Sequence, residues 1–252
     1  MKKLVAAILA VSLLFALIGC RKKPEEIPPG SSPEISSESP EPSEIPTPTP
    51  AEEPPSSEIN FAEMQAKNPD IYGYLEIPGS VISQPIVQHP SDDTYYLTHS
   101  PYKQKRQSGA VFTEKTYNTK TFDDPVTILY GHRMRTQVMF STLQALYSDA
   151  KSFNAHREII IYTPERTLRY EVFAAVPYDN RHILYHYDFT RASSSALFFK
   201  SIRAVHEIGA NFAEDTSVTT NDKVLILSTC LRGNNDRRYL VLAKLVPPAS
   251  AD

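Results

Sequence analysis

The chain has 252 residues, of which 41% are hydrophobic, and a formal net charge of -3. This length allows one or two domains. The small net charge and the lack of basic runs interleaved with aromatic residues exclude a nucleic-acid partner. The 21 prolines against 8 glycines indicate a Pro-rich segment beside a compact domain. The only cysteines are Cys20 and Cys230.

Residues 1–20 have the pattern of an export signal or signal anchor: two lysines, then a stretch that is apolar apart from Ser12. The segment LIGC at residues 17–20 resembles the lipobox of bacterial lipoproteins, in which Cys20 would be lipidated. An uncleaved anchor that ends at Cys20 is the alternative. The basic residues 21–23 weaken both interpretations, because positive charge prefers the cytoplasmic side. Either way, we expect the rest of the chain to be tethered outside the cell membrane.

Residues 21–58 are predicted to be a disordered stalk rich in Pro, Glu and Ser. Of residues 24–58, 11 are Pro and nine are Glu, with no Lys or Arg. Such a composition cannot bury a core, and like charges repel one another and extend the chain. A position between anchor and domain favours a stalk over an incidental disordered tail.

Residues 59–252 form the predicted domain, whose structured part is 59–246. Its short apolar strands outnumber its helices, which predicts a mainly β protein with a closed or half-open barrel. The predicted strands are 71–77, 81–88, 110–113, 126–130, 158–163, 168–176, 224–227 and 239–246. The predicted helices are 61–67, 139–147 and 190–211.

Cys230 stands where a buried strand ends, after the apolar run 224–227. Polar residues follow, and then Arg238 opens another apolar strand. Two adjacent strands joined by this loop would bring Cys230 and Arg238 together at one rim of the sheet. Basic neighbours favour the thiolate form of a cysteine. The alternative is a Cys that only ends a core strand.

His132 has the same kind of position, directly after the strand 126–130 and Gly131. A histidine there suits proton transfer near neutral pH. No metal-ligand spacing surrounds it, and with one Cys in the domain a zinc site is not expected. The other six histidines lie in polar or helical stretches and are interpreted as surface or packing residues; they are His89, His99, His156, His182, His186 and His206.

These motifs together resemble the sortase family of Gram-positive bacteria. Three segments are similar to that family's active-site pattern. They are Tyr130-Gly131-His132, Ser228-Thr229-Cys230 about a hundred residues later, and Arg238 at the start of a strand. Further segments resemble its class B branch: residues 68–80, 84–88, 95–97 and 109–112, and a helical insertion from about 178 to 217. The resemblance covers essentially all of 59–246.

The resemblance implies an eight-stranded sortase-type β-barrel with an N-terminal helix and a helical insertion before the Cys-bearing strand. It implies a cysteine transpeptidase that cleaves a sorting-signal pentapeptide at Thr and needs no cofactor or metal. The acyl group passes to an amine of a peptidoglycan precursor or to a pilin lysine. The partners are therefore secreted proteins with a C-terminal sorting motif, the acceptor amine and, through the N-terminal segment, the membrane.

The resemblance also assigns roles to residues. Cys230 is the expected nucleophile, His132 the proton donor to the leaving amine, and Arg238 the stabiliser of the oxyanion. Arg237 competes for the arginine role, but the family's arginine directly precedes the final apolar strand. The residues expected to bind the peptide are Tyr130, Ser228 and Tyr185, of which Tyr185 is equally a packing aromatic. Leu231 departs from the polar residue common in class B, which affects substrate recognition.

Two other functions remain open from the sequence. A hydrolytic cysteine peptidase on the same fold would use the same three residues and pass the acyl group to water. A surface lipoprotein with a non-catalytic domain would bind peptides without chemistry. The sequence does not give the sorting motif, the accepting amine or the oligomeric state.

Overall fold

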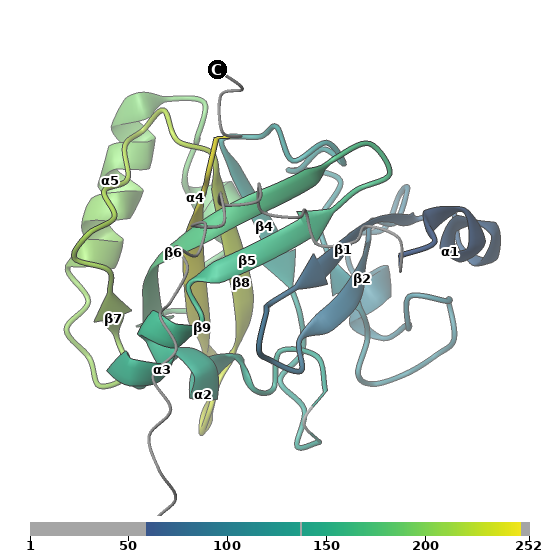
Figure 1. Ribbon diagram of the computed structural model, residues 1–252, viewed down its shortest axis with the longest axis horizontal. Helices are drawn as coiled ribbons and strands as arrows, with labels where there is room; N and C mark the ends of the chain where they lie inside the picture. Colours follow the sequence, from purple (N-terminus) through teal and green to yellow (C-terminus); the bar gives the residue numbers. More distant parts are fainter. Residues whose placement is uncertain (1–58, 137, 248–252) are drawn as a thin grey trace, which may run out of the picture. The chain divides into compact units, whose positions relative to one another are not determined.

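The computed structural model describes residues 59–136 and 138–247 (Figure 1). The predicted signal or anchor at 1–20 and the predicted stalk at 21–58 lie outside these residues. Within the described part, no helix combines the length and the apolar character needed to cross a membrane. The helices are α1 (Phe61–Lys67), the 3-10 turn η2 (Tyr95–Leu97), α2 (Leu143–Tyr147), α3 (Ala150–Ala155), α4 (Ile183–His186) and α5 (Ala192–Arg203).

The strands form one sheet that closes on itself (Figure 1). They are β1 (Ile71–Glu76), β2 (Ser83–Val87), β3 (Val111–Phe112), β4 (Val126–Tyr130), β5 (Glu158–Tyr162), β6 (Thr167–Tyr178), β7 (Asn211–Phe212), β8 (Val224–Leu231) and β9 (Asn234–Leu245). The order is β5-β1-β2-β3-β4-β8-β9-β6-β7, and an added β5–β6 pairing closes a ring of eight strands. The short strand β7 pairs with β6 outside that ring. The predicted eight-stranded barrel is thus confirmed.

Strand β8 is buried on both faces, which explains its unbroken apolar sequence. Leu225 and Leu227 point into the barrel core. Val224 and Ile226 belong to a second cluster outside the barrel, together with Phe198 of α5. Figure 1 shows α5 running beside the barrel wall that includes β6, β8 and β9. Because side chains alternate along a strand, the outer face of β8 continues through Ser228 to Cys230.

The predicted N-terminal helix is confirmed as α1. Its N-cap is Asn60, whose side-chain oxygen accepts the backbone N–H of Glu63 at 3.0 Å. The helix ends at Lys67, and its C-cap Asn68 is extended, as the following Pro69 favours. The helical insertion before the Cys-bearing strand is also present, as α4 and α5 between β6 and β8.

The predicted helix 190–211 is too long. The structure ends α5 at Arg203, and Asn211 already belongs to strand β7. Gly209 has φ +87, which is incompatible with a right-handed helix. Ile208, which lies inside the predicted helix but after α5, is fully exposed. The apolar residues of this segment are therefore divided between a helix, a loop and a strand.

The predicted helix 139–147 begins later than its spacing suggests. Met139 has φ +56 and forms an isolated bridge with Arg133, so α2 begins only at Leu143. The predicted strand 224–227 is too short, and the predicted strand 239–246 begins too late. In the structure, β8 and β9 continue through residues predicted as a loop, and only Arg232 and Gly233 lie in the turn between them.

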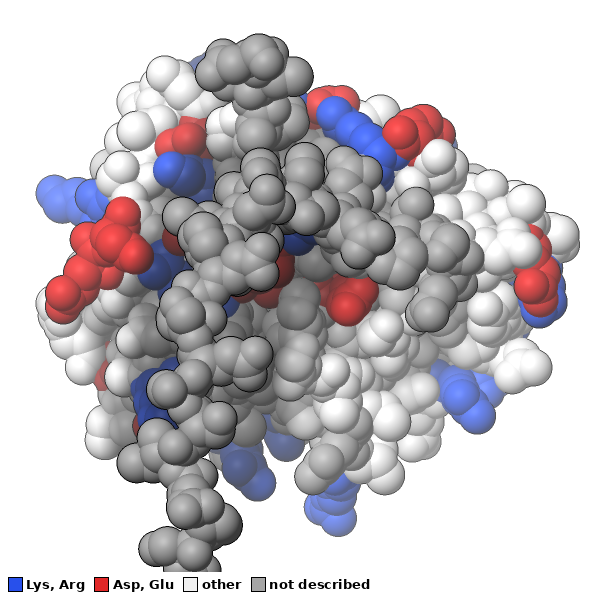
Figure 2. Space-filling view, in the orientation of Figure 1, with Lys and Arg blue, Asp and Glu red and all other residues white. Residues whose placement is uncertain are grey.

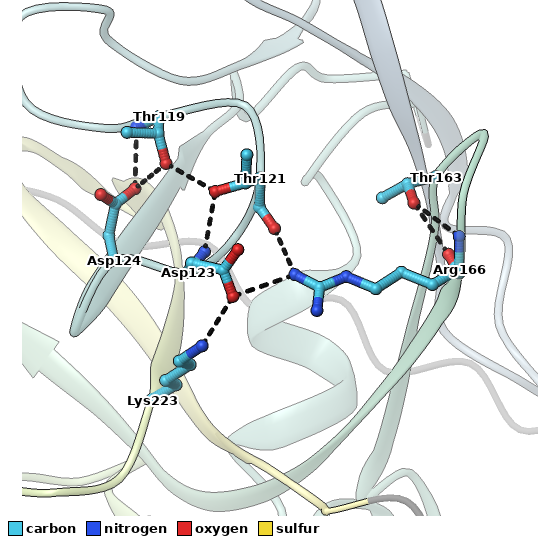
Figure 3. Close-up of polar contacts among 7 residues, drawn as sticks. All are labelled: Thr119, Thr121, Asp123, Asp124, Thr163, Arg166 and Lys223. Carbon is cyan, nitrogen blue, oxygen red and sulfur yellow. Dashed lines mark hydrogen bonds and ion pairs between the residues drawn. The ribbon is translucent and has the colours of Figure 1, made fainter.

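Ion pairs join segments that are distant in sequence. On the face in Figure 2, Lys and Arg side chains lie beside Asp and Glu at several places. One cluster precedes β4 and β8 (Figure 3): Asp123 accepts from Lys223 at 2.6 Å and from Arg166 at 3.1 Å. Arg166 also donates to the carbonyl of Thr121 at 2.6 Å. These contacts connect the loop before β4, the β5–β6 hairpin and the start of β8.

Candidate active site

Cys230 and Arg238 face each other across the β8–β9 hairpin. They are register partners, and Nη1 of Arg238 lies 3.8 Å from Sγ of Cys230. Both side chains are half-buried. The hairpin has a bulge after Cys230, since Leu231 pairs with Asn234. The bulge lets Arg238 donate back to the carbonyl of Asn235 at 2.9 Å, which holds the guanidinium beside the thiol.

His132 follows β4, the parallel neighbour of β8. Its position begins with Gly131, whose backbone N–H donates to the carbonyl of Ser228 at 3.1 Å. A Cβ at residue 131 would come within 2.6 Å of the buried ring of Phe140, so glycine is required for this close approach. The Nε2–H of His132 donates to the carbonyl of Leu97 at 2.8 Å. That bond fixes the ring and leaves Nδ1 free for a proton.

A groove of about 300 Å³ joins these residues. Its floor is the outer face of β4, β8 and β9, and its walls are the loop before β3 and the segment that leads into α4. Tyr130 and Ser228 are register partners in this floor. Burial and the nearby Glu114 carboxylate raise the pKa of the Tyr130 phenol, which therefore stays protonated. The groove is lined by Cys230, His132, Arg238, Tyr130, Ser228, Thr229, Phe112, Glu114, Asp93, Thr94, Leu97, Gly131, Asn180, Arg181, His182 and Ile183.

Comparison with known proteins identifies this architecture. The sortase domain pattern matches residues 75–246. The chain belongs to the sortase family. Members of this family are cysteine transpeptidases. The match spans about two thirds of the chain and includes the three predicted catalytic residues, His132, Cys230 and Arg238.

Individual relatives are sortase B proteins, as the class B motifs predicted. Sortase B of Listeria monocytogenes is 29% identical over 168 residues, which are 67% of this chain and 65% of that protein. The chain therefore spans slightly less than two thirds of the Listeria sortase. A crystal structure of Bacillus anthracis sortase B has a TM-score of 0.63 and 29% identity, covering 74% of this chain and 83% of that one. Clostridium perfringens sortase B, at 24% identity, has a TM-score of 0.65, with coverage of 74% and 100%.

Five of the six site residues predicted for the sortase domain line this one groove: Cys230, His132, Arg238, Tyr130 and Ser228. Among the described residues, no hydrogen bond joins Cys230 to His132.

Tyr185 does not line this groove. It belongs to α4, a single turn that buries Ile183 toward the core and leaves Tyr185 77% exposed. Tyr185 lines a neighbouring pocket with Tyr117 and Phe189 instead. A role of Tyr185 in covering the peptide therefore stays a prediction, and its placement in this structure does not support it.

Arg237 also points away from the sortase groove. Its two Nη atoms donate to the two carboxylate oxygens of Glu207, both at 2.6 Å. This bidentate pair holds Arg237 on the opposite side of β9 from Arg238, as alternation along a strand requires.

Several residues of the groove were missed from the sequence. His182 was interpreted as a surface or packing residue, but its Nε2–H donates to the Glu114 carboxylate at 2.8 Å inside the groove. Thr229 was noted only as part of a motif; within the described chain its buried hydroxyl has no hydrogen-bond partner. Glu114 directly follows the predicted apolar strand 110–113, and this signal could have found it. His182 lies six residues after the predicted strand 168–176, so no local signal marks it.

The described residues contain no group of three or more His, Cys, Asp or Glu side chains that could hold a metal ion.

Proposed function

We propose that this chain is a cysteine transpeptidase that cleaves a sorting-signal pentapeptide at its Thr and joins the acyl group to an amine. The observation that carries this proposal is the 3.8 Å contact between Arg238 and the Cys230 sulfur, in a groove that also holds His132. A nucleophile, a cation and an acid–base group along one groove are the parts that acyl transfer requires.

The first half of the reaction forms a thioester. The Cys230 thiolate attacks the carbonyl carbon of the Thr, and the new C–S bond places negative charge on the carbonyl oxygen. Arg238 donates to that oxygen as charge develops. The C–N bond then breaks, and the imidazolium of His132 gives its proton to the leaving amine. Tyr130 and Ser228 line the path of the peptide.

The second half resolves the thioester. An acceptor amine attacks the same carbonyl carbon, the C–S bond breaks, and Cys230 leaves as thiolate. The neutral His132 takes the proton that the attacking amine must lose, so the starting protonation states are restored.

The relatives indicate the classes of partner. One solved structure is a Staphylococcus aureus sortase B–substrate complex, and another is sortase B complexed with triglycine. For this chain we propose a secreted protein with a C-terminal sorting motif as acyl donor. The proposed acceptor is an amine of a peptidoglycan precursor or a pilin lysine.

We also propose that the domain works outside the cell membrane. The support is the apolar segment 1–20 and the Pro- and Glu-rich composition of 21–58, both of which precede the domain. Metabolic labelling with a fatty-acid analogue would distinguish a lipidated Cys20 from an uncleaved anchor, because only the lipidated protein would carry the label and lose it in Cys20→Ser.

The proposal is tested with the full chain in detergent micelles and quenched fluorescent peptides that carry NPxTx-, LPxTG-, SPxTG- and PPxTG-like motifs. Oligoglycine or a diaminopimelate-type amine is added or omitted, and Cys230→Ala and His132→Ala are measured in parallel. We expect cleavage at the Thr, its loss in both variants, and an amine-linked product detected by mass spectrometry.

Other outcomes support the other functions. Cleavage that yields only the free acid with every amine would indicate a hydrolytic peptidase. Peptide binding without cleavage, equal in the wild type and Cys230→Ala, would indicate a non-catalytic binding domain.

A further inference from the structure

The groove holds a carboxylate that the proposed chemistry does not use. Glu114 follows β3 and lines the same groove as Cys230. Its side chain is 16% exposed. An acidic group that is mostly removed from water and still lines a peptide groove needs a partner to offset its desolvation. His182 provides that partner at 2.8 Å.

The hydrogen bonds of His182 determine the charge of this pair. Nδ1 of His182 accepts the backbone N–H of Tyr185 at 3.1 Å, which caps α4. Nδ1 therefore carries no proton, and the single ring proton lies on Nε2, which donates to Glu114. A neutral imidazole and a carboxylate together carry one negative charge. The pair is fixed in place but not neutralised.

Neighbouring cations are engaged elsewhere. Lys115, next in sequence, donates its ammonium to the carbonyl of Pro90 at 2.6 Å. Arg181, which also lines the groove, is paired with Asp179 at 2.6 Å. Within the described chain, His182 is the one basic side chain within ion-pair distance of Glu114. The groove is thus basic at Arg238, beside Cys230, and acidic at Glu114 and at Asp93, whose Oδ1 accepts the backbone N–H of Lys115 at 2.6 Å.

The strand register gives the distance between these two ends. One row of paired residues crosses β3, β4 and β8: Phe112, Tyr130 and Ser228. Glu114 lies two residues after Phe112, and Cys230 lies two residues after Ser228. Because β3 is antiparallel to β4 and β8, Glu114 and Cys230 lie on opposite sides of this row, about 13 Å apart along the strands and, over two strand spacings, about 10 Å apart across them. The combined separation is about 16 Å, and an extended peptide covers about 3.3 Å per residue. A peptide with its Thr at Cys230 therefore needs about three to five residues to reach Glu114, the smaller number where a long Lys or Arg side chain covers the last part.

The direction of the strands places the proposed catalytic residues at the other end of this row. β3 is antiparallel to β4 and β8, so Glu114 lies on one side of the row, and Cys230 and His132 each lie two residues beyond it on the other side. The part of the peptide that reaches Glu114 is therefore a side chain several residues away from the Thr.

We propose that Glu114, oriented by His182, is a specificity-determining residue that selects a sorting peptide with Lys or Arg about three to five residues from the Thr. This inference rests on the proposed function. A cationic side chain at that point would form an ion pair in a partly desolvated groove, where such pairs are stronger than at an open surface.

The test compares peptides that carry Lys, Gln or Glu at each of the five positions on either side of the Thr, cleaved by the full chain in detergent micelles. We expect kcat/KM for one Lys peptide, with its Lys about three to five residues from the Thr, to exceed that of its Gln counterpart about tenfold, with Glu poorest. Glu114→Gln keeps an acceptor for His182 and should reduce the Lys-to-Gln ratio to about one. Salt should reduce the same ratio in the wild type, without any substitution.

Glu76→Gln is the matched control, because the Glu76 carboxylate accepts a hydrogen bond from Tyr162 at 3.0 Å outside the groove. It should leave the Lys preference unchanged. Cleavage at the Thr without a Lys preference, or with a preference that Glu114→Gln retains, overturns this inference and leaves the proposed function standing. Cleavage of no peptide at all overturns both.

Discussion

The parallel strands β4 and β8 begin together at one end of the barrel and finish together at the other. The residues just before the two strands differ in their contacts from the residues at and after their ends. Before the strands, Asp123 binds both Lys223 and Arg166 (Figure 3). After them come His132 and Cys230, where the contact between Arg238 and sulfur is long, at 3.8 Å. The first end has its charges paired, and the second keeps reactive groups available.

This difference shows how one strand pair serves two purposes. Ion pairs before the strands connect three segments and add stability, at the cost of holding the side chains rigidly. The other end holds its side chains through backbone contacts instead, such as the Leu97 carbonyl that accepts from His132. Side chains held in this way keep atoms free for a substrate, as a preorganised site requires.

The largest expected effect is at the groove end. Arg238→Lys should lower kcat/KM for the cleaved peptide about 100-fold or more, because an ammonium cannot reproduce the planar guanidinium at the oxyanion. Peptide-cleavage kinetics measure this loss. The matched control is Arg237→Lys, one residue away and paired with Glu207. If both variants lose activity equally, Arg238 has no special role and the two ends of the barrel differ less than the geometry indicates.

Gly131→Ala should affect stability and activity together. The added methyl would lie 2.6 Å from the ring of Phe140, a residue with no exposed surface. Overpacking of this kind costs about 1–3 kcal/mol of unfolding free energy, and a shift of His132 lowers the cleavage rate further. Urea denaturation and kcat/KM measure the two effects. In Gly131→Ala/Phe140→Leu the combined cost should be smaller than the sum of the single costs.

Asp123→Asn should affect stability alone. The neighbouring Lys223 and Arg166 hold the pKa of Asp123 at about 2, below its ordinary 3.8. Because the side chain is half-exposed, we expect the loss in unfolding free energy to be only about 1 kcal/mol or less, or roughly 2–4 °C in Tm. Peptide cleavage at 25 °C should not change.

The pH dependence of that loss follows from the lowered pKa. A carboxylate with a depressed folded-state pKa stabilises the protein above its unfolded pKa, and this contribution disappears as pH falls through the folded pKa. The Tm difference between wild type and Asp123→Asn should therefore be complete above 3.8 and vanish toward pH 2. A difference that persists undiminished at pH 2 would show that charge is not its cause.

The smallest expected effect is at Tyr185, which lies outside the groove. Tyr185→Ala should change kcat/KM by less than about twofold, because the removed ring is 77% exposed and touches another pocket. Tyr130→Ala removes an aromatic ring from the groove itself and should lower kcat/KM about tenfold or more, with folding checked by denaturation. Equal losses in the two variants would place Tyr185 in peptide binding after all.

Much of the fold was predictable because its signals are local. The apolar run at 224–227, followed by polar residues, predicted both a buried strand and its exposed end. The helix at 61–67 was predicted from its cap and from the proline after it. The helix at 190–211 was wrong in its length, because apolar spacing alone does not separate a helix from a loop that leads into an edge strand.

The sequence by itself indicated the chemistry that we propose for this protein: Cys230 and His132 after apolar strands, and Arg238 directly before one. Only the tertiary structure decided what surrounds them. Glu114 and His182 are 68 positions apart and meet because the insertion after β6 packs against the groove beside β3. Local periodicity describes which face of an element is buried, whereas contacts between distant segments depend on how the whole barrel closes.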